Sequence, residues 1–267
     1  MELVFYRTLL AALAMAAIVL FARIPWKVDA KVLIRLLLTG SLVAFHWITF
    51  FGSARVSNVS VSLIGFATAS LWTSLLEPWI QGKRIRLLEV LMGGTVLVGI
   101  AIIFSFDFAY KTGLFLGVLS GLLAAVFSVI NARLVRDHSP YVITLYEMTG
   151  ACLSIALFFP IYLHTWAPTD LSLVPSAMDW VYIGILALVC TVYAFTVMVD
   201  LMKRISVFSI QLTINLEPVY GIIMAVLIFG EKERMDLSFY LGALLILSAV
   251  FAYPLLKYRF SRLFPDY

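Results

Sequence analysis

The chain has 267 residues, of which 63% are hydrophobic and 13% charged, and its mean hydropathy is +1.04. Soluble domains are about 45–50% apolar and about 25% charged, so a water-soluble enzyme of this composition would expose more apolar surface than solubility allows. The net charge of +4 does not indicate nucleic-acid binding, because the basic residues form short clusters between apolar runs. The composition therefore predicts an all-α protein that crosses the lipid bilayer several times.

Nine apolar runs are long enough to cross a bilayer, whose hydrocarbon core of about 30 Å takes roughly 20 residues of helix. The runs are continuous rather than alternating, which argues against membrane strands. The first run could be a secretory signal, but its basic flank follows the apolar core instead of preceding it. The predicted spans are residues 3–22, 32–54, 58–80, 86–106, 112–134, 140–162, 179–202, 206–229 and 236–257.

Most of the 19 lysines and arginines lie in the loops after the first, third, fifth and seventh spans and in the C-terminal tail. An excess of these residues marks the cytoplasmic side of a membrane protein. We therefore expect the C-terminus in the cytoplasm and, with nine spans, residue 1 outside. The basic residues that fall on the opposite side are Arg7, Arg55, Lys111, Lys232 and Arg234.

The sequence also resembles itself at two offsets. A shift of 148 places Val59 and Gly82 on Val207 and Gly230, and a shift of 140 places Tyr6 on Tyr146. Spans one to four thereby match spans six to nine, and span five has no partner. A complete repeat would have five helices, an odd number, so successive repeats would cross the membrane in opposite senses, as in many secondary transporters.

This pattern predicts a bundle of two inverted five-helix repeats from which the first of ten helices is missing. Residues 1–106 would form the first repeat without its first helix, and residues 112–258 would form the second. An in-frame apolar segment encoded upstream would support this expectation.

Four short motifs carry a likeness to a known family. They are Phe5-Tyr6-Arg7-Thr8-Leu9-Leu10-Ala11, Asn215-Leu216-Glu217-Pro218-Val219, Phe229-Gly230-Glu231-Lys232 and Gly82-Lys83-Arg84. Through them the chain resembles the EamA family of the drug/metabolite transporter superfamily over nearly its whole length. The resemblance implies a ten-helix carrier of the bacterial inner membrane, and many members export amino acids, metabolites or drugs. One difference is Ser70, which stands where the second repeat has Pro218, so a proline kink is expected in span eight only.

Polar residues deep in the membrane are the candidates for function, because each ionisable group there costs at least about 2.5–3.5 kcal/mol. Glu217 lies near the middle of span eight, directly before Pro218, whose ring kinks the helix and releases a backbone carbonyl. Gln211 and Asn215 share one helix face four residues apart. These amides either line a wet cavity or join helices by hydrogen bonds.

Glu147 lies two turns into span six, too deep to reach water easily, and is the second candidate carboxylate. Arg7 holds the matching repeat position in span one and is expected to snorkel outward. His46, near the centre of span two, could move protons or form a hydrogen bond within the core.

Several other residues fall into groups. Three acids near span ends are expected at the interface with water: Glu77, Glu89 and Asp200. Four aromatic residues could form a pocket wall: Trp72, Tyr146, Tyr193 and Tyr220. A stripe of small residues on span five predicts close helix packing or a sliding surface: Gly113, Gly117, Gly121 and Ala125.

The leading hypothesis is a secondary carrier that exports a small molecule through a central cavity, with Glu217 and Glu147 as substrate or coupling sites and protons as an available coupling ion. Cys152 and Cys190 have no companion cysteine, and no catalytic triad, nucleotide motif or metal-ligand spacing occurs. We therefore expect no cofactor, no metal and no enzymatic activity. The alternatives are a non-transporting scaffold or sensor and an intramembrane enzyme that uses His46 with one of the glutamates.

Overall fold

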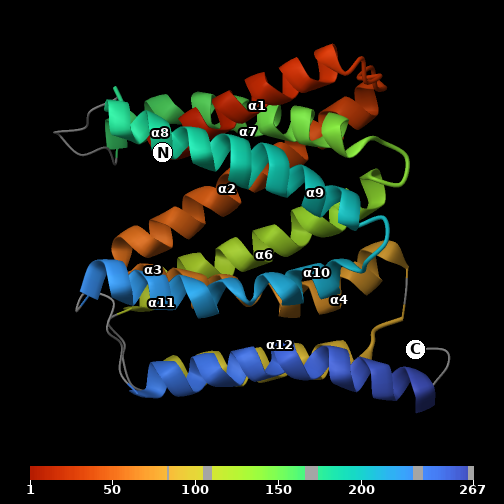
Figure 1. The fold of residues 1–267 in the computed structure, drawn as a ribbon, viewed down its shortest axis with the longest axis vertical. Helices are drawn as coiled ribbons and strands as arrows, with labels where there is room; N and C mark the ends of the chain where they lie inside the picture. The colour runs from red at the N-terminus through yellow and green to blue at the C-terminus, as the bar shows by residue number, and fades with distance from the viewer. Residues whose placement is uncertain (83, 105–109, 166–173, 231–236, 264–267) are drawn as a thin grey trace. The chain divides into compact units, whose positions relative to one another are not determined.

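The computed structural model describes residues 1–82, 84–104, 110–165, 174–230 and 237–263 (Figure 1). None of the residues in these ranges belongs to a strand. The helices are α1 (Glu2–Phe21), α2 (Ala30–Val56), α3 (Val59–Phe66), α4 (Ala69–Gln81), α5 (Leu87–Phe104), α6 (Lys111–Leu134), α7 (Pro140–Thr165), α8 (Ala177–Ala187), the π-helix η2 (Leu188–Tyr193), α9 (Ala194–Leu201), α10 (Val207–Ile214), α11 (Glu217–Phe229) and α12 (Leu237–Leu263).

Seven helical stretches of the described chain are long and apolar enough to cross a membrane. The prediction of an all-α polytopic membrane protein is therefore confirmed. The two other predicted spans coincide with α5 and with the interrupted pair α10–α11. Of the predicted motif residues, Lys83, Glu231 and Lys232 lie outside the described ranges.

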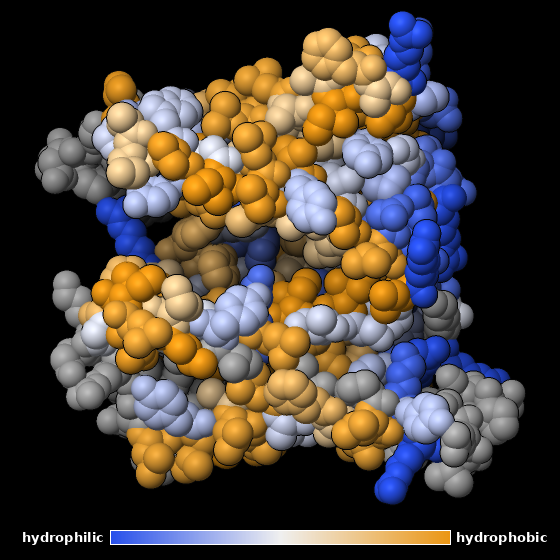
Figure 2. Space-filling model, viewed as in Figure 1, coloured by the Kyte–Doolittle hydropathy of each residue, from blue (hydrophilic) through white to orange (hydrophobic). Residues whose placement is uncertain are grey.

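The helix flanks are covered by large apolar side chains. Phe21 is 88% exposed, and Leu157, Trp79 and Leu227 are exposed to a similar degree. Figure 2 shows this apolar cover on the helix flanks in view, with hydrophilic side chains gathered toward helix ends. Such a surface suits lipid tails rather than water, as the composition predicts.

The chain divides into two compact units that interleave along the sequence. The first unit contains residues 1–48 and 130–204, and the second contains residues 49–129 and 205–267. Each unit therefore draws helices from both of the predicted repeats. The boundaries fall inside α2 and α6, so these two helices contribute to both units.

In the first unit α1 packs along α7 and α8 (Figure 1). The ring centroids of Phe5 and Phe159 are 6.0 Å apart, and Thr8 interacts with Cys152, so α1 and α7 run antiparallel. The backbones of α2 and α7 also approach closely, since a Cβ at Gly40 would overlap the carbonyl of Glu147. Small residues allow this closeness in membrane helix pairs.

In the second unit α5 lies along α12, again antiparallel. The hydroxyl of Tyr253 donates to Glu89 Oε1 at 3.0 Å, while Gly99, further along α5, faces Gly242. Between α4 and α10, the backbone N–H of Phe208 donates to Glu77. In both units, helices that the predicted repeats match thus pack side by side in opposite directions. This packing supports an inverted repeat, which itself remains a prediction.

Two interrupted helices recur at the same offset. The bounds of α3 and α4 each differ by 148 from those of α10 and α11, and Gly82 and Gly230 both have positive φ, at 66° and 59°. The proline kink expected in span eight only stays a prediction. The interruption in span three is of another kind, because α3 ends at Phe66 and α4 begins at Ala69 without a proline. Instead, Thr68 bonds back to the Gly65 carbonyl through both its N–H and its hydroxyl.

The small-residue stripe of α6 is a packing surface in the second unit. A Cβ at Gly117 would meet the backbone of Gly65, and one at Gly121 would meet Thr68 and its neighbours. Helix α6 therefore touches the α3–α4 chain at its interruption. This contact supports the packing interpretation of the stripe.

Candidate functional site

The interruption between α10 and α11 brings two amide side chains into the second unit. Asn215, almost fully buried, donates from Nδ2 to Ser70 Oγ on α4 at 3.0 Å. Gln211, one turn earlier, donates from Nε2 to Ser128 Oγ on α6 at 2.8 Å. Both amides therefore join helices, which is one of the two roles expected of them.

Each of these amides also keeps an acceptor without a donor. Within the described chain, Asn215 Oδ1 and Gln211 Oε1 are buried without a hydrogen-bond partner, and so is the indole Nε1 of Trp72. A buried polar atom without a partner costs about 1–3 kcal/mol. Asn215 and Gln211 thus carry unsatisfied acceptors that are buried from water in this conformation.

Glu217 opens α11 immediately after the interruption, with Pro218 in the same first turn. Its side chain is half-buried, and no described residue donates a hydrogen bond to its carboxyl oxygens. The sequence predicts Glu217 near the middle of span eight, and the structure places it directly after the two-residue turn of Asn215 and Leu216, whose dihedral angles stay in the right-handed helical region. The Glu217 side chain is thus partly exposed beside the turn that separates α10 from α11.

Glu147 has a different environment in the first unit. Its side chain is 0% exposed, and Asn131 Nδ2 donates to its Oε2 at 3.0 Å. Two oxygens of this pair, Glu147 Oε1 and Asn131 Oδ1, have no donor among the described residues. A protonated carboxyl group would add one donor to this pair. Glu147 is thus enclosed rather than exposed to a cavity.

The expectation that Arg7 snorkels outward is wrong. Its side chain is only 7% exposed, its Nε donates to Thr191 Oγ1 at 2.8 Å, and its Cζ lies 3.9 Å from the ring centroid of Trp47. The reason is packing, because α7, α8 and η2 cover α1 in the first unit. No ion pair joins Arg7 to Glu147 in the described chain.

Two acids expected at the water interface are instead buried. Glu77 accepts the hydrogen bond from the N–H of Phe208 at 3.0 Å, which satisfies a donor at the start of α10. Glu89 accepts from Tyr253 at 3.0 Å and from Arg86 at 3.1 Å. These carboxylates tie α4, α5, α10 and α12 together. Asp200 forms an exposed ion pair with Lys203, as an interfacial acid should.

The remaining candidates are distributed over both units. His46 is buried beside Trp47 in the first unit, which also contains the exposed Tyr193. Tyr146 donates its hydroxyl to the Trp26 carbonyl at 3.0 Å and so holds the loop between α1 and α2. Trp72 and Tyr220 belong to the second unit. The predicted aromatic wall stays a prediction.

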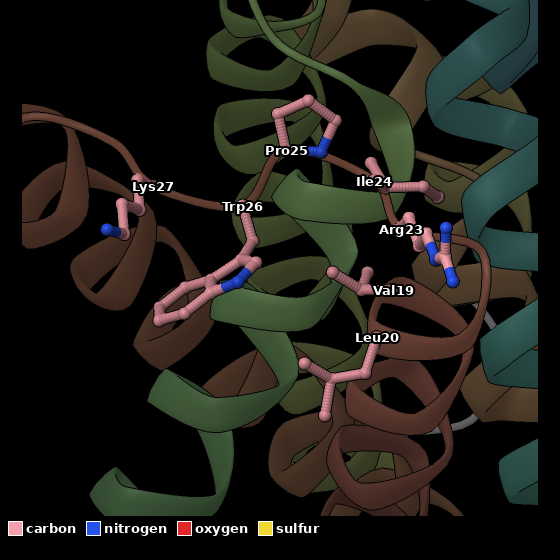
Figure 3. Close-up of a pocket in the computed structure, with 7 residues that line it drawn as sticks. All are labelled: Val19, Leu20, Arg23, Ile24, Pro25, Trp26 and Lys27. Carbon is pink, nitrogen blue, oxygen red and sulfur yellow. The ribbon is translucent and has the colours of Figure 1, made fainter.

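A pocket of about 330 Å³ lies at the loop between α1 and α2 (Figure 3). Its apolar floor comes from the end of α1, and its two cations, Arg23 and Lys27, lie on opposite sides of it in the figure. These charges do not converge on one point, and no predicted site residue lines the pocket. The lining residues are Val19, Leu20, Arg23, Ile24, Pro25, Trp26 and Lys27.

Long apolar helices that carry amide and carboxyl groups far from their ends are typical of polytopic membrane proteins with polar sites at depth. Residues 111–253, more than half of the chain, match the model of the EamA-like transporter family, and the chain belongs to this family. It is therefore a multi-pass membrane transporter.

Two comparisons extend over nearly the whole chain. A protein from Bacillus subtilis (strain 168) described as "Uncharacterized transporter YxxF" is 23% identical over 258 residues, which are 93% of this chain and 79% of the relative. A solved crystal structure aligns with a TM-score of 0.69 at 17% identity and covers 96% of this chain and 88% of its own. The second likeness concerns the fold alone.

Proposed function

We propose that this chain is a secondary carrier that exports a small solute across the bacterial inner membrane. Membership of a transporter family supports solute movement as the general activity. The observation that carries the proposal is the pair of interrupted helices in the second unit, where Asn215 contacts Ser70. Carriers built from repeats commonly place their substrate sites at such discontinuous helices.

The side chains around the α10–α11 interruption are the proposed substrate contacts. The unsatisfied acceptors of Asn215 and Gln211 would receive hydrogen bonds from an ammonium or hydroxyl group of the solute. The half-buried carboxyl group of Glu217 would add a charged contact. A small metabolite, an amino acid or a drug-like molecule with such donors fits these groups.

Protons are the proposed coupling ion, and Glu217 is the proposed proton carrier. Its carboxyl group has no described hydrogen-bond donor that would hold it in one charge state. A carboxyl group in such a partly apolar place can be neutral in one conformation and charged in another. The enclosed pair of Glu147 with Asn131 is the second proposed proton site.

Export requires a defined orientation, which we propose from the charge distribution. The C-terminus would lie in the cytoplasm, because the basic clusters mark the inner side. Residue 1 would lie outside. No further cofactor, metal or nucleic acid belongs to the proposal.

The direct test uses the purified protein in proteoliposomes loaded with a mixture of amino acids, nucleosides and organic cations. Mass spectrometry of the external medium measures which solutes leave and how fast. We expect at least one solute to leave faster than from protein-free liposomes, and its exit to accelerate under an inward proton gradient. Equal efflux of every solute from both kinds of liposome would contradict the proposal.

A further inference from the structure

The guanidinium group of Arg7 is a buried cation without a carboxylate partner. Ion pairs in the described chain join Met1 with Glu2, Arg86 with Glu89 and Lys203 with Asp200, and none includes Arg7. Because a buried charge is stable only when it is compensated, this environment indicates that something else balances the charge during function.

The hydroxyl of Thr191 satisfies only one donor of this guanidinium. Thr191 accepts from Arg7 Nε and donates its own proton to the Leu186 carbonyl at 2.8 Å. This second bond spans five residues because Thr191 lies in the π-helix η2, a rare element that often marks functional sites. The π-turn therefore orients Thr191 so that it fixes the Nε side of Arg7, and a neutral hydroxyl does not balance the charge.

Trp47 fixes the plane of the same group. With Arg7 Cζ 3.9 Å from the ring centroid, the indole covers one face of the guanidinium and attracts its charge. The two Nη groups have no hydrogen-bond acceptor among the described residues. They form an edge whose two parallel N–H bonds match the two oxygens of a carboxylate.

We propose that Arg7 binds the carboxylate group of a small monoanionic acid, amino acids included, through this Nη edge. The inference goes beyond the proposed function, because it concerns the first unit alone, whereas the proposed substrate contacts at the α10–α11 interruption lie in the second. One guanidinium in otherwise neutral contacts balances one negative charge, which favours a carboxylate over a doubly charged phosphate. Thr191 and Trp47 are positioning residues, because they touch Arg7 and set the direction of its free edge.

A purely structural role makes a different prediction. If Arg7 only joined α1 to η2 and to Trp47, its replacement would lower stability without changing the response to any ligand. Carboxylates and their amides would then act alike on the wild-type protein. The comparison of acid with amide therefore separates the two roles.

The test measures thermal unfolding of the detergent-solubilised protein with matched probes at equal ionic strength. The matched pairs of acid and amide are phenylacetate with phenylacetamide and phenylalanine with phenylalaninamide. Phenyl phosphate is added to compare a doubly charged anion with the singly charged carboxylates. The variants are Arg7→Gln, Arg7→Lys and the control Arg35→Gln, which removes one positive charge at an exposed position of α2.

We expect the acids to stabilise the wild type more than their amides. Arg7→Lys should weaken acid binding roughly ten- to a hundredfold, since lysine keeps the positive charge but lacks the two parallel N–H bonds of the guanidinium group. Arg7→Gln should abolish the preference, and Arg35→Gln should keep it. If Arg7→Gln does not fold, the difference between the thermal shifts caused by acid and by amide is still compared between the wild type and Arg7→Lys, and a smaller difference in Arg7→Lys is the expected result.

Equal shifts by acid and amide, no shift by either, or a preference that survives in Arg7→Gln would each overturn the inference. A larger shift by phenyl phosphate would overturn the carboxylate assignment. If proteoliposomes release no solute while the acid preference holds, the transport proposal fails and anion binding by Arg7 stands. If solutes are released without any acid preference, the inference alone fails.

Discussion

At the scale of residues, burial distinguishes two carboxyl groups that look alike in the sequence. Both Glu147 and Glu217 lie inside apolar runs, and both are predicted as coupling sites. The structure encloses Glu147 completely beside Asn131, whereas Glu217 is half-buried at a helix interruption. A group that exchanges protons with water during transport needs access, so Glu217 is the stronger candidate for coupling.

The substitution Glu217→Gln should remove the proton-driven part of transport. The glutamine keeps the size and polarity of the side chain but cannot release a proton. We expect solute efflux from proteoliposomes to become independent of the pH gradient while the protein still unfolds at the wild-type temperature. Asp137→Asn, which removes an exposed acid, serves as the control and should retain the dependence; a gradient response that persists in Glu217→Gln would exclude this role.

Replacing Glu147 should affect stability in a way that depends on the new side chain. Glu147→Ala leaves the Asn131 amide without its acceptor and should cost about 1–3 kcal/mol, whereas Glu147→Gln keeps an acceptor and should cost much less. Thermal unfolding in detergent measures both. An alanine variant as stable as the glutamine variant would mean that the pair contributes nothing to the fold.

At the scale of elements, the apolar runs predict the helices well, because bilayer thickness fixes their length. Helix α1 spans Glu2–Phe21, for example, where residues 3–22 are predicted. The internal irregularities were not predictable in the same way. The interruption after Phe66 depends on the bonds of Thr68 to Gly65, and η2 contains the bond of Thr191 to Leu186, neither of which hydropathy reveals.

The candidate site, too, could be predicted from the sequence only in part. Hydropathy identifies Glu217, Asn215 and Gln211 as polar residues at depth, yet it cannot tell which helix faces which. The serine partners Ser70 and Ser128 are far away in the sequence and become visible only through packing. For the same reason the sequence places Arg7 at the surface, although α7, α8 and η2 bury it.

The close contact of α2 with α7 predicts a difference between two equal substitutions. Gly40→Ala would press a methyl group against the backbone of Glu147, whereas Gly184→Ala on α8 meets nothing within 4 Å. Overpacking of this kind costs about 1–3 kcal/mol, so Gly40→Ala should unfold at a lower temperature and Gly184→Ala should not. Equal unfolding temperatures would show that the α2–α7 contact relaxes easily.

At the scale of the whole molecule, the account depends on how the chain is threaded through the membrane. Matched helices pack antiparallel inside each compact unit, as α5 and α12 do through Glu89 and Tyr253. The matched interruptions of α3–α4 and α10–α11 recur at an offset of 148. An inverted repeat accounts for both observations, because equivalent helices must then cross the bilayer in opposite senses.

The labelling of two equivalent loops tests this threading most directly. Single cysteines replace Arg55 and Arg204, both exposed, in a protein whose native Cys152 and Cys190 are serine, and intact cells are treated with a membrane-impermeant thiol reagent. The account predicts that the cysteine at position 55 is labelled from outside and that the one at position 204 is labelled only after the membrane is opened. Labelling of both from the same side would contradict oppositely threaded repeats.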